Sequence, residues 1–210
     1  MDYFFSPLAC SLAGHVLIRE QALPIRTVPV SLQRKTTAEG LDFHAIAPKG
    51  QVPVLRFNEG RVLTENSAIL QVLADLAPAA GLLPPRETPA GQATLEGLSF
   101  VSTELHKLCL YPLFQREVPD TVKAWCQALL PRKLAIVATQ LAQQPWLAGE
   151  RFTIADAYLG WALMLSQHAG VKLSDDPALH ALQDYWQRLL ARPAFAATLA
   201  EEQALFKQYA

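Results

Sequence analysis

The chain opens with Asp2-Tyr3-Phe4-Phe5-Ser6-Pro7-Leu8-Ala9-Cys10-Ser11, an apolar run that passes through a proline turn to a cysteine. Residues 2–5 predict a strand, and the apolar spacing over residues 11–22 predicts a helix. Cys10 therefore falls in the opening turn of that helix, where unpaired N–H groups and the positive dipole end favour a thiolate. It is either a reactive thiol or a small buried apolar residue. No second cysteine completes a C-x-x-C motif, so any redox chemistry here is monothiol.

A second signal is the stretch Gln51-Val52-Pro53, which we expect to be extended. If the Val52–Pro53 peptide bond is cis, the N–H and C=O of Val52 point away from the sheet, and a ligand backbone can pair with them as an added strand. The alternative is an ordinary proline on an edge strand.

A third signal is Glu65-Asn66-Ser67, which comes directly before a helical pattern. Asn66 or Ser67 can cap a helix that starts near Ala68, and simple capping is one reading of the motif. In the other reading, spare N–H groups at the helix start bind a carboxylate and Glu65 holds an ammonium. An amino-acid head group carries both charges, so the three signals together suit a small peptide-like thiol ligand.

The order of these patterns predicts an α/β domain followed by an all-α domain. The expected strands are residues 2–5, 25–30, 52–57 and 61–63, and the expected helices between them are 11–22, 42–46 and 67–76. This βαβαββα order gives a small mixed sheet with helices packed on it. The proline-rich stretch 77–90 reads as a linker, and everything after it is helix-like, with helices expected at 91–110, 121–144, 153–169, 178–191 and 193–208. The expected domains are therefore 1–80 and 91–210, joined by 81–90.

Composition limits the classes of function. The chain has 210 residues, 51% hydrophobic and 18% charged, with a formal net charge of −1. No bulk charge attracts nucleic acid or an anionic membrane, no run of about 18 apolar residues predicts a membrane span, and no signal peptide opens the chain. Three widely spaced cysteines argue against a disulfide framework or a zinc site. We expect a cytoplasmic protein with no metal and no nucleic-acid or membrane partner.

A fourth signal is a polar stripe on the helix expected at 91–110. Ser99, Ser102, Thr103 and His106 fall at i, i+3, i+4 and i+7, one face of an α-helix. The stripe is either exposed to solvent, lines a cleft or faces a partner subunit. We expect His106 to titrate near neutral pH and to donate to a thiol or carboxylate. Further along, the segment 153–156 reads as a structural capping box.

These motifs, taken in order, resemble the glutathione S-transferase superfamily, and specifically its bacterial beta class. The resemblance covers nearly the whole chain and is carried by the stretches 6–13, 35–40, 47–53, 63–69, 102–107 and 151–158. It implies a thioredoxin-like first domain, assembly as a homodimer, and glutathione as co-substrate with no other cofactor.

The resemblance also implies site residues. The glutathione-binding positions are Cys10, Lys35, Gln51, Val52, Pro53, Glu65, Asn66, Ser67, Ser99, Thr103 and His106, and the catalytic ones are Cys10, Ser11 and His106. Cys10 would sit beside the glutathione sulfur and form a mixed disulfide with it. Lys35 would pair with the glycine carboxylate, and Val52 with the cysteinyl backbone next to a cis Pro53. His106 would reach in from the helical domain, and Ser99 and Thr103 would lie near the dimer cleft.

Two positions depart from the family pattern. Phe5 stands where the family often has a tyrosine, so a thiolate-stabilising hydroxyl has to come from elsewhere, with Ser11 the nearest; Ser99 stands where a close relative would have asparagine. The function we expect is conjugation of glutathione to small hydrophobic electrophiles, a detoxification activity. Two alternatives stay open: thiol–disulfide exchange through Cys10, and a glutathione-binding module without turnover. Candidates for the apolar wall of the electrophile site are Tyr111, Phe114, Trp161 and Met164.

Overall fold

The computed structural model describes residues 1–209, which form two compact units. The first unit joins Met1–Gly81 to the chain from Arg192 onward, and the second is Leu82–Ala191. The limits expected from the sequence placed the last helix, α9 (Pro193–Tyr209), in the helical domain. The structure groups it with the first unit because it packs along α1 (Leu12–Glu20).

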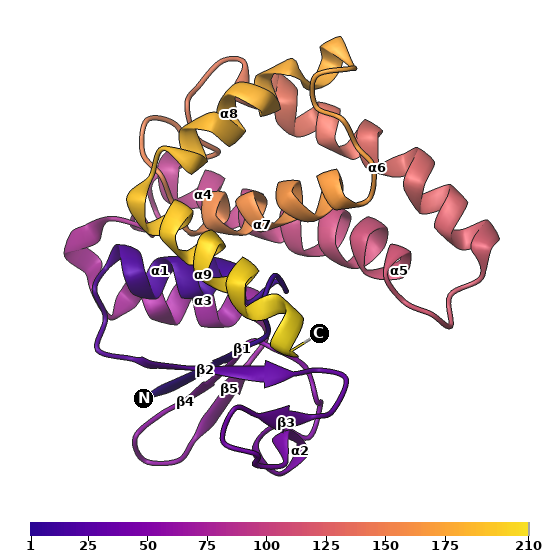
Figure 1. Cartoon of the computed structure of the whole chain (residues 1–210). Coiled ribbons are helices and arrows are strands. Elements are labelled where there is room, and N and C mark those ends of the chain that lie inside the picture. The colour runs from indigo at the N-terminus through magenta and orange to yellow at the C-terminus, as the bar shows by residue number, and fades with distance from the viewer. Residues whose placement is uncertain (210) are drawn as a thin grey trace. The chain divides into compact units, whose positions relative to one another are not determined.

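The first unit is built on a five-stranded mixed sheet of order β3-β2-β1-β4-β5 (Figure 1). The strands are β1 (Asp2–Phe5), β2 (Arg26–Ser31), β3 (Thr36–Thr37), β4 (Val54–Arg56) and β5 (Val62–Thr64). β1 is central, parallel to β2 and antiparallel to β4, and the other pairs are antiparallel. The predicted βαβαββα order is confirmed, with β3 as an addition. Two residues are too short to give a periodic signal, so β3 was not predicted.

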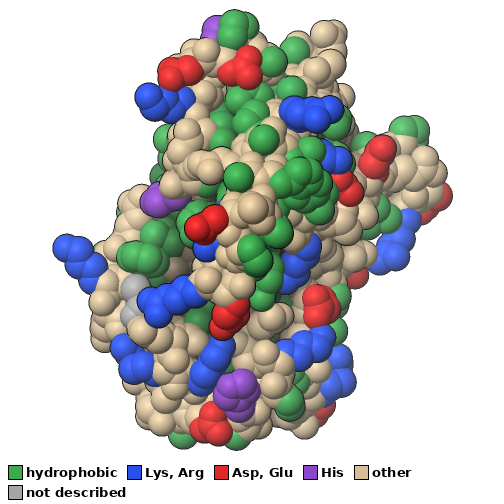
Figure 2. Space-filling model, turned by 90° about the vertical axis from the view of Figure 1, so that its right-hand side faces the viewer, with side chains coloured by type: hydrophobic (Ala, Val, Ile, Leu, Met, Phe, Trp, Pro, Cys, Tyr) green, Lys and Arg blue, Asp and Glu red, His purple; other side chains and the backbone are tan. Residues whose placement is uncertain are grey.

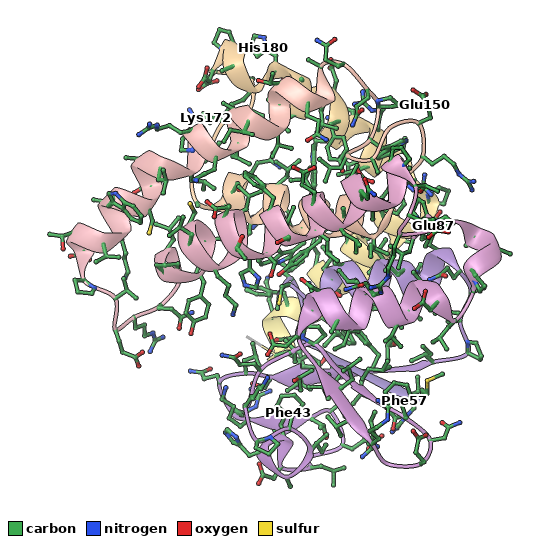
Figure 3. All side chains as sticks on the ribbon, turned by 180° about the vertical axis from the view of Figure 1, so that it is seen from behind. Phe43, Phe57, Glu87, Glu150, Lys172 and His180 are labelled. Atoms are coloured by element: carbon green, nitrogen blue, oxygen red, sulfur yellow. The ribbon has the colours of Figure 1, made fainter. Side chains whose placement is uncertain are left out.

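The side chains of β1 alternate between the two faces of the sheet, as a strand requires. Phe4 faces α2 (Phe43–Ile46), where its ring lies 6.0 Å from that of Phe43, labelled in Figure 3. Tyr3 and Phe5 face the opposite side, on which α1, α9 and α3 (Asn66–Asp75) lie together (Figure 1). The Phe5 ring stacks 4.6 Å from His15 of α1. β1 therefore packs against helices on both faces of the sheet, and the turn that carries Cys10 follows directly after it.

The second unit is all-helical. Its elements are α4 (Pro89–Phe100), η2 (Val101–Leu110), α5 (Tyr111–Leu113), α6 (Asp120–Leu141), α7 (Ile154–His168), η3 (Pro177–Leu179) and α8 (His180–Leu190), and the short helix η1 (Pro78–Ala80) precedes them in the first unit. α7 is the core helix, because most of its residues are buried and it packs against α4, η2 and α8. α6 continues through Pro131. Among the described helices, none is both long and apolar enough to span a membrane.

The helix predicted at 91–110 changes type at its middle. It is α-helical to Phe100, and η2 is a π-helix, whose i→i+5 hydrogen bonds turn the chain less per residue than an α-helix. The predicted polar stripe is therefore divided: Ser99 and Thr103 are exposed, whereas His106 is buried. The i, i+3, i+4, i+7 rule failed here because it assumes an α-helical period throughout.

Charged side chains are spread over the surface. On the face drawn in Figure 2, basic and acidic side chains are interspersed, as the net charge of −1 suggests.

Candidate functional site

Cys10 lies in the turn between β1 and α1, two residues before the helix begins at Leu12. Its side chain is half-buried, and its thiol donates to the Val52 carbonyl over 3.4 Å. The Val52–Pro53 peptide bond is cis, which meets the condition stated for that stretch, and the pairing of Val52 with a ligand backbone stays a prediction. The Cys10 carbonyl in turn accepts from the Asn66 side-chain amide at 3.1 Å. The fold thus brings together three of the predicted signals, which come from three separate segments.

Ser11 closes the turn on itself. Its hydroxyl donates to the Ser6 carbonyl over 3.2 Å and accepts from the Ser6 N–H over 3.1 Å, and its carbonyl accepts from the Tyr3 hydroxyl over 2.6 Å. Ser11 is completely buried. A hydroxyl has a single proton to donate, and this one goes to Ser6. Ser11 therefore shapes the turn that presents Cys10, and its donation to a ligand sulfur, which would require the hydrogen bond to Ser6 to break, stays a prediction.

The start of α3 is open to an anion. The helix begins at Asn66, its N-cap is Glu65 in a left-handed conformation (φ 73°), and within the described part of the chain the Glu65 side chain makes no capping hydrogen bond. The expectation that Asn66 or Ser67 caps a helix starting near Ala68 is wrong, because both residues already lie inside the helix. Within residues 1–209, the buried Asn66 Oδ1 and Ser67 Oγ have no hydrogen-bond partner. A buried polar atom left unpaired costs about 1–3 kcal/mol, so these atoms suit a polar ligand.

Charged groups surround the cis-proline segment. Lys49 Nζ lies 2.6 Å from a Glu65 carboxylate oxygen and 3.1 Å from the Thr64 hydroxyl. Lys35, whose φ is 54°, donates from Nζ to the Gly50 carbonyl over 2.9 Å. The Glu65 carboxylate thus pairs with the Lys49 ammonium, and its pairing with a ligand ammonium stays a prediction. Lys49 was missed, although its position beside Gly50-Gln51 in the sequence is a usable signal.

A backbone donor is available at the cis-proline segment. Within the described chain, the Val52 N–H makes no hydrogen bond, while the Val52 carbonyl receives the Cys10 thiol. Gln51, just before it, is exposed. An extended ligand backbone can therefore pair with Val52 in the way that an added strand pairs with a sheet edge.

His106 is a buried, neutral imidazole of the second unit. Its Nδ1 lies 2.5 Å from the Tyr158 hydroxyl, and its ring packs edge-on against Trp161 at 4.5 Å. Burial, helped by the nearby Lys107 charge, lowers the pKa of His106 to about 3. The expectation that His106 titrates near neutral pH is wrong, because desolvation disfavours the imidazolium. Tyr158, which lies 52 residues further along the chain, gave no local signal.

The other candidates of the second unit differ in exposure. Thr103 and Ser99 are exposed, and the Thr103 hydroxyl donates to the Ser99 carbonyl over 3.0 Å. Among the expected apolar-wall residues, Trp161 and Met164 are buried in α7, whereas Tyr111 and Phe114 are exposed.

Comparison with known proteins identifies the family. Residues 9–76 match the glutathione S-transferase N-terminal domain, and residues 102–193 match its C-terminal domain. The chain is 40% identical over 202 residues to glutathione S-transferase GstA of Escherichia coli O157:H7, covering 96% of this chain and 98% of that relative. A sphingomonad glutathione S-transferase solved in complex with glutathione has 37% identity and a TM-score of 0.89, covering 97% of this chain and 99% of its own.

The chain belongs to the glutathione S-transferase family, and it is a transferase. Within that family it resembles the bacterial beta class. A beta-class enzyme from Sphingomonas chungbukensis has 36% identity and a TM-score of 0.88, covering 96% of this chain and 98% of its own. The predicted fold class, a thioredoxin-like domain followed by a helical domain, is confirmed.

Proposed function

We propose that this protein transfers glutathione to small hydrophobic electrophiles, and that the Cys10 turn, the cis-proline segment and the start of α3 hold the glutathione. The observation that carries the proposal is the meeting of Cys10, Val52 and Asn66, which are linked by hydrogen bonds of 3.4 and 3.1 Å. The Val52 backbone, the uncapped start of α3 and the Cys10 thiol thus lie close together in the first unit.

The charges of the site complement those of glutathione, which has two carboxylates and one ammonium. The uncapped N–H groups and the Ser67 hydroxyl at the start of α3 favour one carboxylate, and the Lys35 ammonium favours the other. Glu65 is suited to the ligand ammonium, which would replace the Lys49 ammonium that it holds now. The central cysteinyl residue would pair with the Val52 N–H and C=O, which places its sulfur near Cys10.

Thiolate formation is the chemical step that such a site supports. The positive end of α1 and neighbouring N–H donors favour a charged sulfur, raising the thiolate fraction at neutral pH. Phe5 has no hydroxyl and that of Ser11 is used within the turn, so in our proposal backbone donors stabilise the sulfur. The glutathione thiolate then attacks the electrophilic carbon, forms the C–S bond and expels the leaving group.

The test is glutathione-dependent conjugation of a chlorodinitrobenzene-type substrate, followed by the absorbance of the thioether. We expect saturable turnover in both substrates above the uncatalysed rate. Binding of glutathione without turnover across a panel of aryl halides, epoxides and enones would reject conjugation and leave a binding module. Turnover restricted to disulfide substrates would instead favour the exchange reaction through Cys10.

We keep His106 as a proposed glutathione-binding residue, and its replacement gives a test. His106→Ala should raise the KM for glutathione by about tenfold, the equivalent of one lost hydrogen bond of ~1.4 kcal/mol. Because the pKa of His106 is about 3, the imidazole stays neutral above pH 5, so the ratio of wild-type to variant kcat/KM should be constant from pH 5.5 to 8. His180→Ala, at an exposed histidine labelled in Figure 3, is the control. Unchanged KM and kcat in His106→Ala would remove His106 from the site.

We also propose a cytoplasmic homodimer. Two-fold homodimers are the commonest oligomers, and the second unit exposes large apolar side chains that an interface would cover. Trp125 is 54% exposed, Ile136 56% and Phe114 48%. Light scattering coupled to gel filtration should give twice the 23.1 kDa chain mass, and a mass of one chain at micromolar concentration would reject the dimer.

A further inference from the structure

A fully buried carboxylate from the last helix reaches the turn that carries Cys10. Glu202 of α9 has no exposed surface, and one of its oxygens accepts from the Leu8 backbone N–H over 2.7 Å. Its other oxygen lies 2.9 Å from His15 Nδ1, in α1, and His15 is itself only 3% exposed. The carboxylate therefore bridges the two sides of the cysteine turn, since Leu8 precedes Cys10 and His15 follows it.

Helix packing alone does not require this carboxylate. α9 already buries Phe195 and Leu199, and an apolar residue at position 202 would avoid the cost of desolvating a charge. That cost is visible as a raised pKa of Glu202, caused first by burial and opposed by the His15 and Leu8 hydrogen bonds. Because both hydrogen bonds end on the turn or on α1, the group is placed where it can fix the turn.

The backbone of the turn that carries Cys10 adopts an unfavourable conformation, which other contacts have to stabilise. Leu8 has a φ of 62°, a left-handed conformation that costs a non-glycine residue roughly 1–2 kcal/mol. The Ser6–Ser11 hydrogen bonds close the base of the turn, and the Glu202 side chain accepts a hydrogen bond from the Leu8 N–H. Other charges around His15 are more distant: Glu201 lies 4.0 Å from His15 Nε2 and pairs with Arg19 at the surface.

We propose that Glu202 is a positioning residue for Cys10: by binding the Leu8 N–H and His15 together, it fixes the turn so that the Cys10 sulfur stays beside the Val52 carbonyl. Helix α9 then helps to form the thiol site, because it supplies the Glu202 carboxylate that holds the turn. The inference rests on the proposed function only for the use made of Cys10, and its test requires no glutathione turnover.

The experiment measures the rate at which iodoacetamide alkylates Cys10 in the full-length protein from pH 6 to 10, with the labelled cysteines identified by mass spectrometry. The limiting rate at high pH reports how accessible the thiolate is, and the midpoint reports its pKa. The variants are Glu202→Asp, which keeps the charge but is too short to bridge both partners, Glu202→Ala and Glu202→Gln. Glu201→Gln is the matched control on the neighbouring residue.

We expect the limiting rate to rise at least threefold in Glu202→Asp and Glu202→Ala, because Cys10 leaves the Val52 carbonyl when the turn loosens. Glu202→Gln should stay near wild type, since its amide oxygen can accept from Leu8 while its NH2 donates to His15, and Glu201→Gln should match wild type. Limiting rates within threefold of wild type in Glu202→Asp, with circular dichroism unchanged, would overturn the proposal.

A purely structural role for Glu202 has a different signature. If the variants only loosened the whole protein, the buried Cys109 and Cys126 would be labelled along with Cys10, and that pattern would also overturn the proposal. Should Glu202→Ala fail to fold, the comparison of Glu202→Asp with Glu202→Gln still decides the question. A wild type without conjugating activity would contradict the proposed function and leave the alkylation result readable.

Discussion

Replacing Asp156 with alanine should destabilise the protein by about 3–5 kcal/mol, because several buried donors lose their acceptor and each costs about 1–3 kcal/mol when left unpaired. Asp156 is completely buried at the start of α7 and receives four hydrogen bonds. One oxygen accepts from the Leu147 N–H at 2.8 Å and the Tyr185 hydroxyl at 2.9 Å, and the other accepts from the N–H and hydroxyl of Thr153, both at 2.8 Å. Alanine leaves all four donors without this acceptor, and the capping box of the core helix is lost.

Urea unfolding followed by circular dichroism measures this loss. Asp156→Asn should recover less than half of it, because its NH2 group faces two of the four donors whichever way the amide is turned. Asp184→Ala, at an exposed position of α8 in the same unit, is the control and should stay within about 0.5 kcal/mol of wild type. A change below 1 kcal/mol in Asp156→Ala would show that water or neighbouring groups satisfy these donors.

The parts of the fold that were predictable depend on residues close together in the sequence. The apolar run of β1 and the capping box at Thr153 and Asp156 each depend on residues only a few positions apart. The same holds for the position of Cys10 before α1, whereas the cis state of the Val52–Pro53 bond and its contact with Cys10 come from the structure.

The features that were missed depend on distant partners or on a change of helical period. The low pKa of His106 comes from burial beside Tyr158 and Trp161, more than 50 residues away, and Glu202 meets Leu8 across 194 positions. Neither contact leaves a local pattern in the sequence. In the π-helix η2 the residues of the predicted polar stripe do not share one face, because its period differs from the 3.6 residues per turn that the prediction assumed.

The role of Ser11 shows why a candidate donor cannot be assigned by proximity in the sequence alone. Ser11 is adjacent to Cys10, and its hydroxyl was a reasonable source for a hydrogen bond to sulfur. Five residues earlier, Ser6 offers both an N–H and a C=O, and the turn brings them to the same hydroxyl. The hydroxyl proton of Ser11 is used to satisfy a buried backbone carbonyl, so in this structure it is not directed at a ligand sulfur.

Replacing Cys10 with serine should separate the two reactions proposed for this site. Thiol–disulfide exchange should fall by more than about 100-fold, since a serine hydroxyl is not ionised at neutral pH and cannot act as the attacking thiolate. In that reaction the Cys10 thiolate attacks the glutathione sulfur of a mixed disulfide and releases the other thiolate. A second glutathione thiolate then attacks the Cys10–glutathione disulfide, giving oxidised glutathione and restoring the Cys10 thiolate.

Conjugation should survive the same substitution at a tenth or more of the wild-type rate, because in our proposal the glutathione thiolate is stabilised by backbone donors rather than by Cys10. The serine hydroxyl can also keep the hydrogen bond to the Val52 carbonyl that the thiol makes. The two activities are measured side by side, exchange as glutathione-dependent reduction of hydroxyethyl disulfide and conjugation with the chlorodinitrobenzene-type substrate.

Cys126→Ser is the matched control, since Cys126 is buried and donates to the Leu108 carbonyl as a serine could. Burial likewise raises the pKa of Cys109 to about 11, so this thiol is protonated at neutral pH and should not carry exchange. If Cys10→Ser kept full exchange, another group would have to be the nucleophile. If it lost conjugation together with exchange, Cys10 itself would activate the glutathione sulfur, and the backbone donors could not be its main support.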